Sequence, residues 1–369
     1  MKILHITQLL GVGGLERLIQ SLILQQMKSG HQVALLVYGD DQTWVPRFRA
    51  LGIEVFNDYV KKNGYDWELL QVVRARAQHF DVIHSHDLNP AMYLGPLRAL
   101  ATLGVLTFPQ WVHTAHGMDH ITKRPITTWY ERLFTRFSDG VVGVAAHICT
   151  TYREKIWLSK KRIHQIDNGI ALEAREPLAV AERTERLRTN FGVVARGPVW
   201  ICVSRVVPLK DQGLVLAAAR ELPQTTFLLV GPSGDDAYWS ELQKNCPPNV
   251  TFLGGQDNIP ELLSLSDYYV SPSHHEGIPL AVLEAAAQGL PAALSDIPGH
   301  RALQNGERPI ALYFKKGSVS ELVNAVRNIE QSAELGRDLA HQFRSIVRTH
   351  YSQERMARDY ERVYRLVLP

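Results

Sequence analysis

Short apolar runs alternate with amphipathic stretches along the whole chain. The runs predict strands at residues 3–9, 32–38, 52–56, 81–84, 111–115, 140–144 and 163–166, and again at 199–203, 226–230, 250–253, 268–271, 292–294 and 310–313. Helical periodicity lies between them, for instance at 126–137, and strands that alternate with helices form parallel sheets. We therefore expect an α/β protein with two doubly wound parallel sheets.

A charged segment that is poor in aromatic residues separates the two sets of strands. At 172–196 it indicates a linker with a short helix, so we expect one Rossmann-like domain at 1–171 and a second at 197–350. A length of 369 residues also favours two domains. The final segment, 351–369, predicts an amphipathic helix with one apolar stripe. The stripe consists of Met356, Tyr360, Val363, Tyr364 and Val367.

Two glutamates eight positions apart lie in the stretch 273–291. Glu276 follows a predicted strand, and Glu284 lies in a predicted helix that ends at Gly289. Pro279 suits the first turn of this helix, because its missing N–H would have no partner there. A loop between a strand's carboxyl end and a helix is where open α/β sheets bind anionic ligands. One carboxylate could face a reacting group while the other holds a hydroxyl; two surface glutamates are the simpler alternative.

A glycine-rich loop opens the first predicted helix. Gly11, Gly13 and Gly14 allow a ligand to approach the backbone closely. However, Glu16 stands where the dinucleotide fingerprint needs its third glycine, and the chain has no GxxxxGK[ST] run. These departures argue against NAD binding and against P-loop chemistry.

Composition and charge exclude several classes of protein. The three cysteines form no CxxC pair, which suits a reducing cytoplasm. No uncharged apolar run reaches ~18 residues, so we expect no transmembrane helix. Residues 97–172 hold 10 basic and 5 acidic side chains. This surplus could approach an anionic lipid surface or be an ordinary solvated surface, and no motif for nucleic-acid binding accompanies it.

Taken together, the motifs resemble those of the retaining GT-B glycosyltransferases of the group 1, family 4 type. The similarity covers most of the chain. The matching segments are 13–16 (GGLE), 81–86 (DVIHSH), 113–117 (HTAHG), 168–170 (NGI), 203–211 (VSRVVPLKD) and the pair of glutamates at 276 and 284. The resemblance implies two Rossmann-like domains that face each other across a cleft, with the last helix crossing back to the first. Ala171 and Asp211 depart from the residues usual in the family at those positions.

The resemblance also implies roles for individual residues. Arg205 and Lys210 would hold the diphosphate of a sugar nucleotide and neutralise it as it leaves. Glu284 would bind the ribose hydroxyls, Glu276 would lie beside the transferred sugar, and His116 would lie near that sugar from the first domain. Further donor contacts are implied for Gly13, Gly14, Gly277, Ile278, Pro279 and Leu280.

We expect neither a cofactor nor a metal ion. Asp40-Asp41 and Asp235-Asp236 do not form the Asp-x-Asp motif of the other major transferase fold. The remaining strand histidines lack a metal-site spacing, and we interpret them as structural residues or as a second layer around the site. They are His84, His86 and His113.

These assignments predict transfer of a hexosyl unit from a nucleoside diphosphate sugar to an acceptor hydroxyl, with retention of configuration. We interpret the apolar face of the aromatic helix at 126–137 mainly as core. This helix and the basic surplus together favour a lipid-linked saccharide acceptor in bacterial surface polysaccharide or glycolipid synthesis. We expect a cytoplasmic protein with peripheral contact on the inner face of the membrane. The alternatives are a soluble acceptor, a sugar-nucleotide 2-epimerase and a non-catalytic sugar-nucleotide-binding protein.

Overall fold

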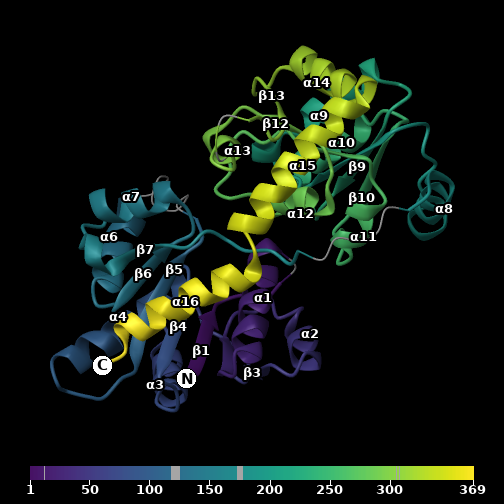
Figure 1. Ribbon diagram of the computed structural model, residues 1–369. Helices are drawn as coiled ribbons and strands as arrows, with labels where there is room; N and C mark the ends of the chain where they lie inside the picture. The colour runs from purple at the N-terminus through teal and green to yellow at the C-terminus, as the bar shows by residue number, and fades with distance from the viewer. Residues whose placement is uncertain (12, 118–124, 173–177, 305, 307) are drawn as a thin grey trace. The chain divides into compact units, whose positions relative to one another are not determined.

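The computed structural model describes residues 1–369 except 12, 118–124, 173–177, 305 and 307. Its contacts divide the chain into two compact units. The first unit combines Met1–Gly169 with Gln353–Pro369, and the second is Ile170–Ser352. Each unit is built on one sheet whose strands are all parallel, with helices packed on the sheet (Figure 1). The expectation of two doubly wound parallel sheets is confirmed.

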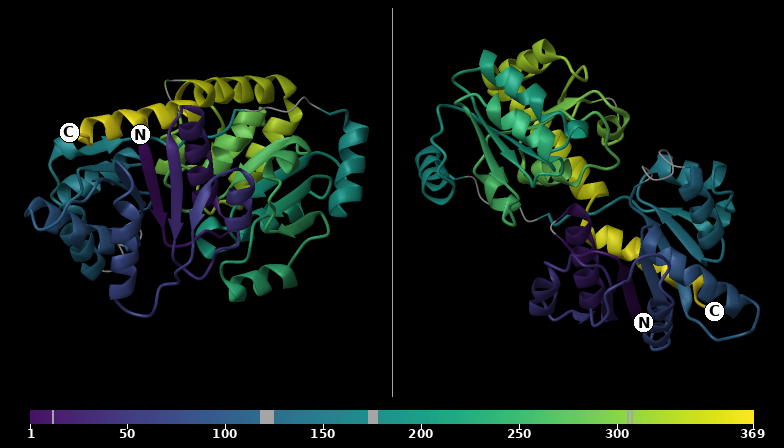
Figure 2. Two further views of the ribbon diagram at one scale, coloured as in Figure 1. Left: turned by 90° about the horizontal axis from the view of Figure 1, so that it is seen from below. Right: turned by 180° about the vertical axis from the view of Figure 1, so that it is seen from behind.

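The sheet of the first unit has the strand order β3-β2-β1-β4-β5-β6-β7. Its strands are β1 (Lys2–Thr7), β2 (Gln32–Val37), β3 (Glu54–Phe56), β4 (Val82–His86), β5 (Gln110–Ala115), β6 (Gly140–Gly143) and β7 (Ile163–Gln165). Its helices are α1 (Gly14–Lys28), α2 (Val45–Ala50), α3 (Trp67–Ala77), α4 (Leu88–Thr102), α6 (Pro125–Thr135), α7 (Ala146–Glu154), η1 (Lys160–Arg162) and α16 (Gln353–Val367). The last of these, drawn in yellow, packs against α1 and β5 (Figures 1 and 2).

Strand alternation decides which side chains of this sheet meet which helices. In β1, Leu4 and Ile6 join an apolar cluster with residues of α3 and α4. His5 lies between them in sequence and faces the other way, where it contacts Gln26 of α1. Successive side chains of a strand point to opposite faces. One face of the sheet is therefore apolar, and the face covered by α1 and α16 carries buried polar groups.

The sheet of the second unit has the order β10-β9-β8-β11-β12-β13. Its strands are β8 (Val199–Val203), β9 (Thr226–Val230), β10 (Val250–Gly254), β11 (Tyr268–Ser271), β12 (Ala292–Ser295) and β13 (Leu312–Phe314). Its helices are α8 (Val180–Phe191), η2 (Pro208–Lys210), α9 (Gln212–Glu221), α10 (Asp236–Lys244), α11 (Ile259–Ser264), α12 (Leu280–Gln288), α13 (Pro298–Arg301), α14 (Val319–Gln331) and α15 (Ala333–His350). One apolar cluster packs α11, α12 and α15 on one face, and another packs α9, α10 and α14 on the other.

Two segments differ in packing from what their sequences favoured. Leu187 of α8 is buried in a core cluster of the second unit, so this helix belongs to that unit. In α6 the aromatic residues are core only in part, because Phe134 packs against a core cluster whereas Trp129 is 53% exposed. Glu131, between them in sequence, is buried. Glu131 takes that place because it accepts a hydrogen bond from Tyr152 and lies 3.2 Å from His113. Of the helices described, none combines the length and apolar character needed to span a membrane.

Gly95 allows α4 and α6 to pack closely. A Cβ atom at this position would lie 2.9 Å from both the Cα and the carbonyl oxygen of Phe134 in α6. Backbone atoms of a packed helix cannot move aside cheaply. By contrast, a Cβ at Gly336 in α15 would meet its nearest neighbour at 3.5 Å, which is ordinary contact.

We predict that Gly95→Ala and Gly336→Ala change stability in opposite directions. Alanine in a helix interior normally stabilises by about 0.5–1 kcal/mol, and Gly336→Ala should do so. Gly95→Ala should instead lower the free energy of unfolding by about 1–3 kcal/mol, because the new methyl group separates two helices. Urea unfolding of both variants measures this. Stabilisation by Gly95→Ala would contradict the close approach of α4 and α6.

Candidate active site

The loops after β8 and β11 lie at one edge of the second sheet, because these two strands pair in parallel. The loop after β8 leads to Lys210, and the loop after β11 carries Glu276. Lys210 Nζ lies 2.5 Å from Glu276 Oε1, and the two side chains are only 18% and 12% exposed. The structure thus brings two of the predicted site residues together as an ion pair.

Neighbouring residues hold Glu276 in place. Ser273 Oγ donates a hydrogen bond to Glu276 Oε1 at 2.7 Å. Gly299 of α13 passes so near that a Cβ there would lie 2.4 Å from the Glu276 carbonyl oxygen. The next residue, His300, is buried and donates from Nδ1 to the Ser295 carbonyl at 2.8 Å, which anchors α13 to the end of β12. No motif in the sequence marked Ser273, Gly299 or His300 as a support for Glu276.

A left-handed residue follows Lys210. Asp211 has φ 49° and ψ 45°, a conformation that glycine and asparagine adopt most readily. Aspartate is tolerated at this position because its short polar side chain can adopt the left-handed region. Asp211 Oδ2 lies 3.1 Å from His274 Nε2. Burial raises the pKa of Asp211.

The helix that carries Glu284 starts slightly later than predicted. Pro279 is the N-cap in an extended conformation, so placing it in the first turn is wrong by one position. Its carbonyl oxygen accepts the hydrogen bond of Leu283 N at 3.2 Å, a role that needs no N–H of its own. Arg205 is exposed in the segment between β8 and η2. Half-buried positions at the start of α12 are Gly277, Ile278, Leu280 and Glu284.

In the first unit the predicted glycines lie at the start of α1. Gly13 is the N-cap of this helix and is extended, with φ −170°. A Cβ on Gly13 would lie 2.5 Å from Glu16 Oε2, so the residue leaves room for that carboxylate. Gly14 is the first helical residue and is exposed. Of these two glycines, Gly14 leaves its backbone exposed, whereas the Glu16 side chain fills the space beside Gly13.

His116 follows β5 and is held at both its backbone and its ring. Its backbone N–H donates to Asp87 Oδ1 at 3.1 Å, and its Nε2 lies 2.9 Å from His86 Nδ1. Asp87 has φ 62° and ψ 179°, a region that residues other than glycine rarely adopt. Such strain costs about 1–3 kcal/mol and gathers at functional sites. The strain at Asp87 supports a functional role for this strand end, and the sequence carried no signal for it.

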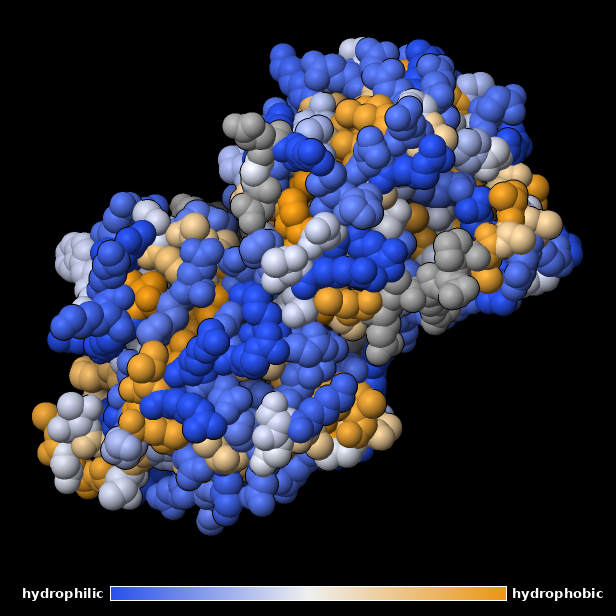
Figure 3. All heavy atoms as spheres, in the orientation of Figure 1, coloured by the Kyte–Doolittle hydropathy of each residue, from blue (hydrophilic) through white to orange (hydrophobic). Residues whose placement is uncertain are grey.

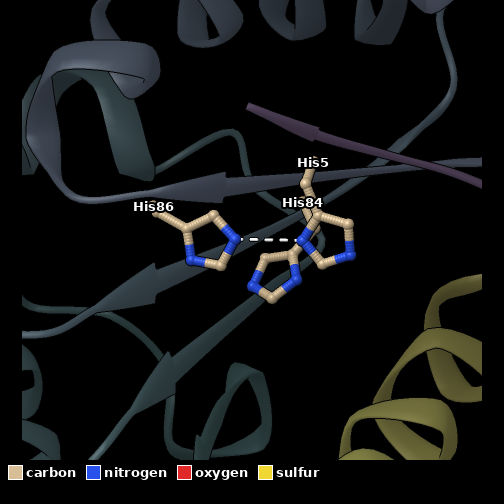
Figure 4. A group of neighbouring side chains, drawn as sticks. All are labelled: His5, His84 and His86. Carbon is tan, nitrogen blue, oxygen red and sulfur yellow. Dashed lines mark hydrogen bonds between the residues drawn. The ribbon is translucent and has the colours of Figure 1, made fainter. Parts of the chain in front are cut away.

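A group of buried histidines lies on the sheet face covered by α1 and α16. Among the described residues, His5, His84 and His86 offer ring nitrogens that all lie within 4.8 Å of one another (Figure 4). His5 of β1 pairs with His84 of β4 in the parallel register, and His86 lies two residues further on the same face. The spacing along the chain concealed this group because it is built from two strands.

Burial keeps these rings neutral. Removal from water lowers the pKa of His5 to about 4, although a hydrogen bond with Gln26 opposes the shift. Burial likewise holds the pKa values of His84 and His86 well below the usual range, and the neighbouring histidines add to the effect. The pKa of His116 is also lowered by burial, partly offset by Asp87.

Two family models match the chain, one in each half. Residues 12–174 match "Glycosyltransferase Family 4", and residues 197–332 match "Glycosyl transferases group 1". A crystal structure of the Anabaena protein Alr3699/HepE in complex with UDP and glucose has the same fold. It superimposes with a TM-score of 0.84 over 98% of each chain, at 19% identity. The chain belongs to the GT-B glycosyltransferases of the family 4 type.

Named enzymes are similar to this glycosyltransferase in sequence. The UDP-Gal:alpha-D-GlcNAc-diphosphoundecaprenol alpha-1,3-galactosyltransferase of Escherichia coli is 28% identical over 246 residues, which span 63% of this chain and 62% of that enzyme. The N-acetyl-alpha-D-glucosaminyl L-malate synthase of Bacillus anthracis is 25% identical over 305 residues, which span 80% of this chain and 77% of that enzyme. The two names describe different kinds of acceptor.

We predict that acid destabilises the first unit of the glycosyltransferase through its buried histidines. An unfolded histidine protonates near pH 6.5, whereas the folded rings have lower pKa values, so stability present above pH 6.5 is lost as the pH falls towards 4. Between about pH 7.5 and about pH 5.5 the free energy of unfolding should fall by about 1.4 kcal/mol for each such histidine.

Urea unfolding of the wild type at the two pH values measures this loss. His5→Gln should reduce the loss, because one of the buried rings is gone. His79→Gln should leave it unchanged, since His79 is exposed on the same unit. Equal stability of the wild type at both pH values would contradict the neutral, buried state of the histidine group.

Proposed function

We propose that this glycosyltransferase moves a hexosyl unit from a nucleoside diphosphate sugar to an acceptor hydroxyl, with retention at the anomeric carbon. The observation that carries the proposal is the ion pair between Lys210 and Glu276 at the carboxyl edge of the second sheet. A compact ammonium group at a strand end suits a departing diphosphate. A carboxylate beside it suits the hydroxyls of the transferred sugar.

Donor binding would replace the contact between Lys210 and Glu276 by contacts of each residue with the donor. The phosphates would draw Lys210 away from Glu276, and the freed carboxylate would accept hydrogen bonds from the sugar while Ser273 keeps it in place. Arg205 is exposed in the segment after β8 and would add a second positive charge. Glu284, in the second turn of α12, would bind the ribose hydroxyls. We propose that the two cations supply the charge that a metal ion provides elsewhere.

We propose front-face displacement as the mechanism. The bond between the anomeric carbon and the leaving phosphate oxygen breaks through an oxocarbenium-like transition state, and the acceptor oxygen bonds to the same face. The acceptor proton passes to the leaving phosphate oxygen, while Lys210 and Arg205 stabilise the negative charge that develops there. The alternative is double displacement with Glu276 as nucleophile. A hexosyl adduct on Glu276, detected by mass spectrometry of the protein, would favour that alternative.

We predict that Lys210→Met lowers kcat/KM for the sugar nucleotide by roughly 100-fold, because the leaving group loses its closest counter-charge. A screen of nucleoside diphosphate hexoses that monitors nucleoside diphosphate release, with and without acceptor, measures the effect. Lys244→Met is the matched control, since Lys244 is exposed on α10 of the same unit. Near-normal kinetics of Lys210→Met would remove Lys210 from the mechanism.

For the acceptor we propose a lipid-linked saccharide or glycolipid. The similar Escherichia coli enzyme is named for a diphosphoundecaprenol acceptor. The surface of the first unit supplies a second argument. Ile126, Trp129 and Trp157 are 54%, 53% and 70% exposed, and Arg132 stacks on the Trp157 ring at 3.4 Å. We call these four residues the aromatic patch.

The aromatic patch has the composition of a membrane-contact surface. Ile126, Trp129 and Arg132 follow each other at intervals of three along α6, so they share one side of the helix. Lys155, Lys160 and Lys161 lie close to Trp157 in sequence and are all exposed. Indole rings at an interface and cations near anionic headgroups both favour membrane association. Figure 3 shows hydrophobic side chains, in orange, among hydrophilic ones on the visible face of this unit.

We predict that the protein sediments with vesicles containing anionic lipid at low salt and is released at high salt. The double variant Trp129→Ser/Trp157→Ser should lose this binding. Trp67→Ser should retain it, because Trp67 is 71% exposed on α3 of the same unit but lies outside the aromatic patch. Absence of wild-type binding at low salt would favour a soluble acceptor, as in the Bacillus anthracis enzyme that is named for L-malate.

A further inference from the structure

A continuous line of hydrogen bonds runs from α1 to His116 through the buried histidines. Gln26 Oε1 lies 2.8 Å from His5 Nε2, and His5 Nδ1 lies 3.0 Å from His86 Nε2. His86 Nδ1 in turn lies 2.9 Å from His116 Nε2. Figure 4 shows the middle link, between His5 and His86, as a dashed line. The line ends on the one histidine to which the family resemblance gives a role near the sugar.

In a line of hydrogen-bonded neutral imidazoles, the donor and acceptor nitrogens of one ring determine those of the next. A neutral ring has one N–H donor and one bare nitrogen acceptor, so the partner of one nitrogen decides the state of the other. Gln26 Oε1 can only accept, so His5 donates from Nε2 and leaves Nδ1 bare. His86 then donates from Nε2 to His5, and His116 donates from Nε2 to His86. The Nδ1 of His116 remains without a proton.

We propose that Gln26, His5 and His86 are positioning residues that fix the tautomer of His116, so that its Nδ1 presents a hydrogen-bond acceptor. The tautomer is a property of the first unit alone. Only its consequence for catalysis, an acceptor for a substrate hydroxyl, rests on the proposed function.

A second line of bonds joins the amide of Gln26 to α16. Gln26 Nε2 donates to Tyr364 OH at 3.1 Å, and Tyr364 OH lies 2.7 Å from His84 Nδ1. His84 Nε2 lies 2.7 Å from Thr114 Oγ1, which lies 3.2 Å from Tyr360 OH. Both tyrosines belong to α16 and are buried. The amide oxygen of Gln26 faces His5 and its nitrogen faces Tyr364, so α16 contacts the residue that sets the tautomer.

The same contacts argue against a metal ion at this group. All six ring nitrogens of His5, His84 and His86 already have a hydrogen-bond partner. An ion bound by these rings would have to break the bond between His5 and His86 and would place its own charge in a buried site. We call the hydrogen-bonded line from Gln26 through His5 and His86 to His116 the relay. The relay and a metal site are distinguishable by experiment.

Long-range ¹H–¹⁵N NMR of the ¹⁵N-histidine-labelled full-length chain, without substrate, tests the proposal. His116→Gln and His86→Gln spectra assign the resonances. We expect a proton on His116 Nε2, a bare Nδ1, and scalar coupling across the hydrogen bond from His116 Nε2 to His86 Nδ1. Absence of this coupling, or a proton on His116 Nδ1, would overturn the proposal. So would loss of the coupling between His5 and His86 on addition of stoichiometric Zn²⁺, which would indicate a metal site instead.

Variants of Gln26 then test its control over His116. Gln26→Leu removes the acceptor for His5 Nε2–H, so the His116 Nδ1 resonance should shift towards the protonated form. Gln26→Glu retains an acceptor at this place and should keep the wild-type His116 tautomer. Gln20→Leu is the control, because Gln20 lies on the same helix but bonds to Arg47. An unchanged His116 resonance in folded Gln26→Leu would contradict the relay.

The kcat of the Gln26 variants tests the catalytic role of His116 separately from its tautomer. If His116 acts on the substrate through Nδ1, kcat should fall in Gln26→Leu and recover in Gln26→Glu. A shifted tautomer with unchanged kcat would keep the relay and refute the catalytic role of His116. Loss of the relay in a protein that still transfers sugar would leave the proposed function intact.

Discussion

Parallel strands place their carboxyl ends at one edge of a sheet, and the chemistry of this protein depends on that constraint. The pairing of β8 with β11 brings Lys210 to Glu276, although 66 positions separate them in the chain. The pairing of β4 with β5 does the same for His86 and His116. Neither pair could form if the strands ran antiparallel, because their loops would then lie at opposite edges.

The ion pair between Lys210 and Glu276 lies at the carboxyl edge of the second sheet and is little exposed. Its two side chains are shielded from water, so separating them without a replacement partner is costly. Under the proposed function, a diphosphate would supply that replacement for Lys210 and a sugar hydroxyl would supply it for Glu276. The structure keeps both charges paired. We propose that the same contact favours a ligand with charge at one end and hydroxyls at the other.

In the first unit the histidine group is ordered by hydrogen bonds between neutral rings and not by an ion pair. The three histidines on β1 and β4, and His116 just after β5, would repel one another if protonated, and burial keeps them neutral. Neutral rings can then bond in series, and each bond orders the next. The cost is sensitivity to acid, since protons bind the unfolded chain more readily than the folded one. Tyr360 and Tyr364 join α16 to this network, and buried apolar side chains of the same helix pack it into the first unit.

The strands and most helices were predictable because they depend on local periodicity. The second-unit strands at 199–203, 226–230 and 268–271 were predicted to the residue. The family motifs also pointed to Lys210 and Glu276. The strain at Asp87, the close approach of Gly299 to Glu276 and the contact of His5 with His86 were not predictable, because each arises where distant segments meet. Trp129 was misplaced in the core because helical periodicity cannot tell a buried apolar face from an exposed one.

The most direct measurement compares ligands that differ only in their phosphates. Isothermal titration calorimetry with nucleoside diphosphates and the corresponding nucleosides, on the wild type and Lys210→Met, isolates the contact between Lys210 and the diphosphate. The account predicts that the substitution weakens binding of the diphosphate by roughly 10-fold or more and leaves the nucleoside almost unaffected. Equal losses for both ligands, or none for either, would contradict the exchange of partners at the Lys210–Glu276 pair.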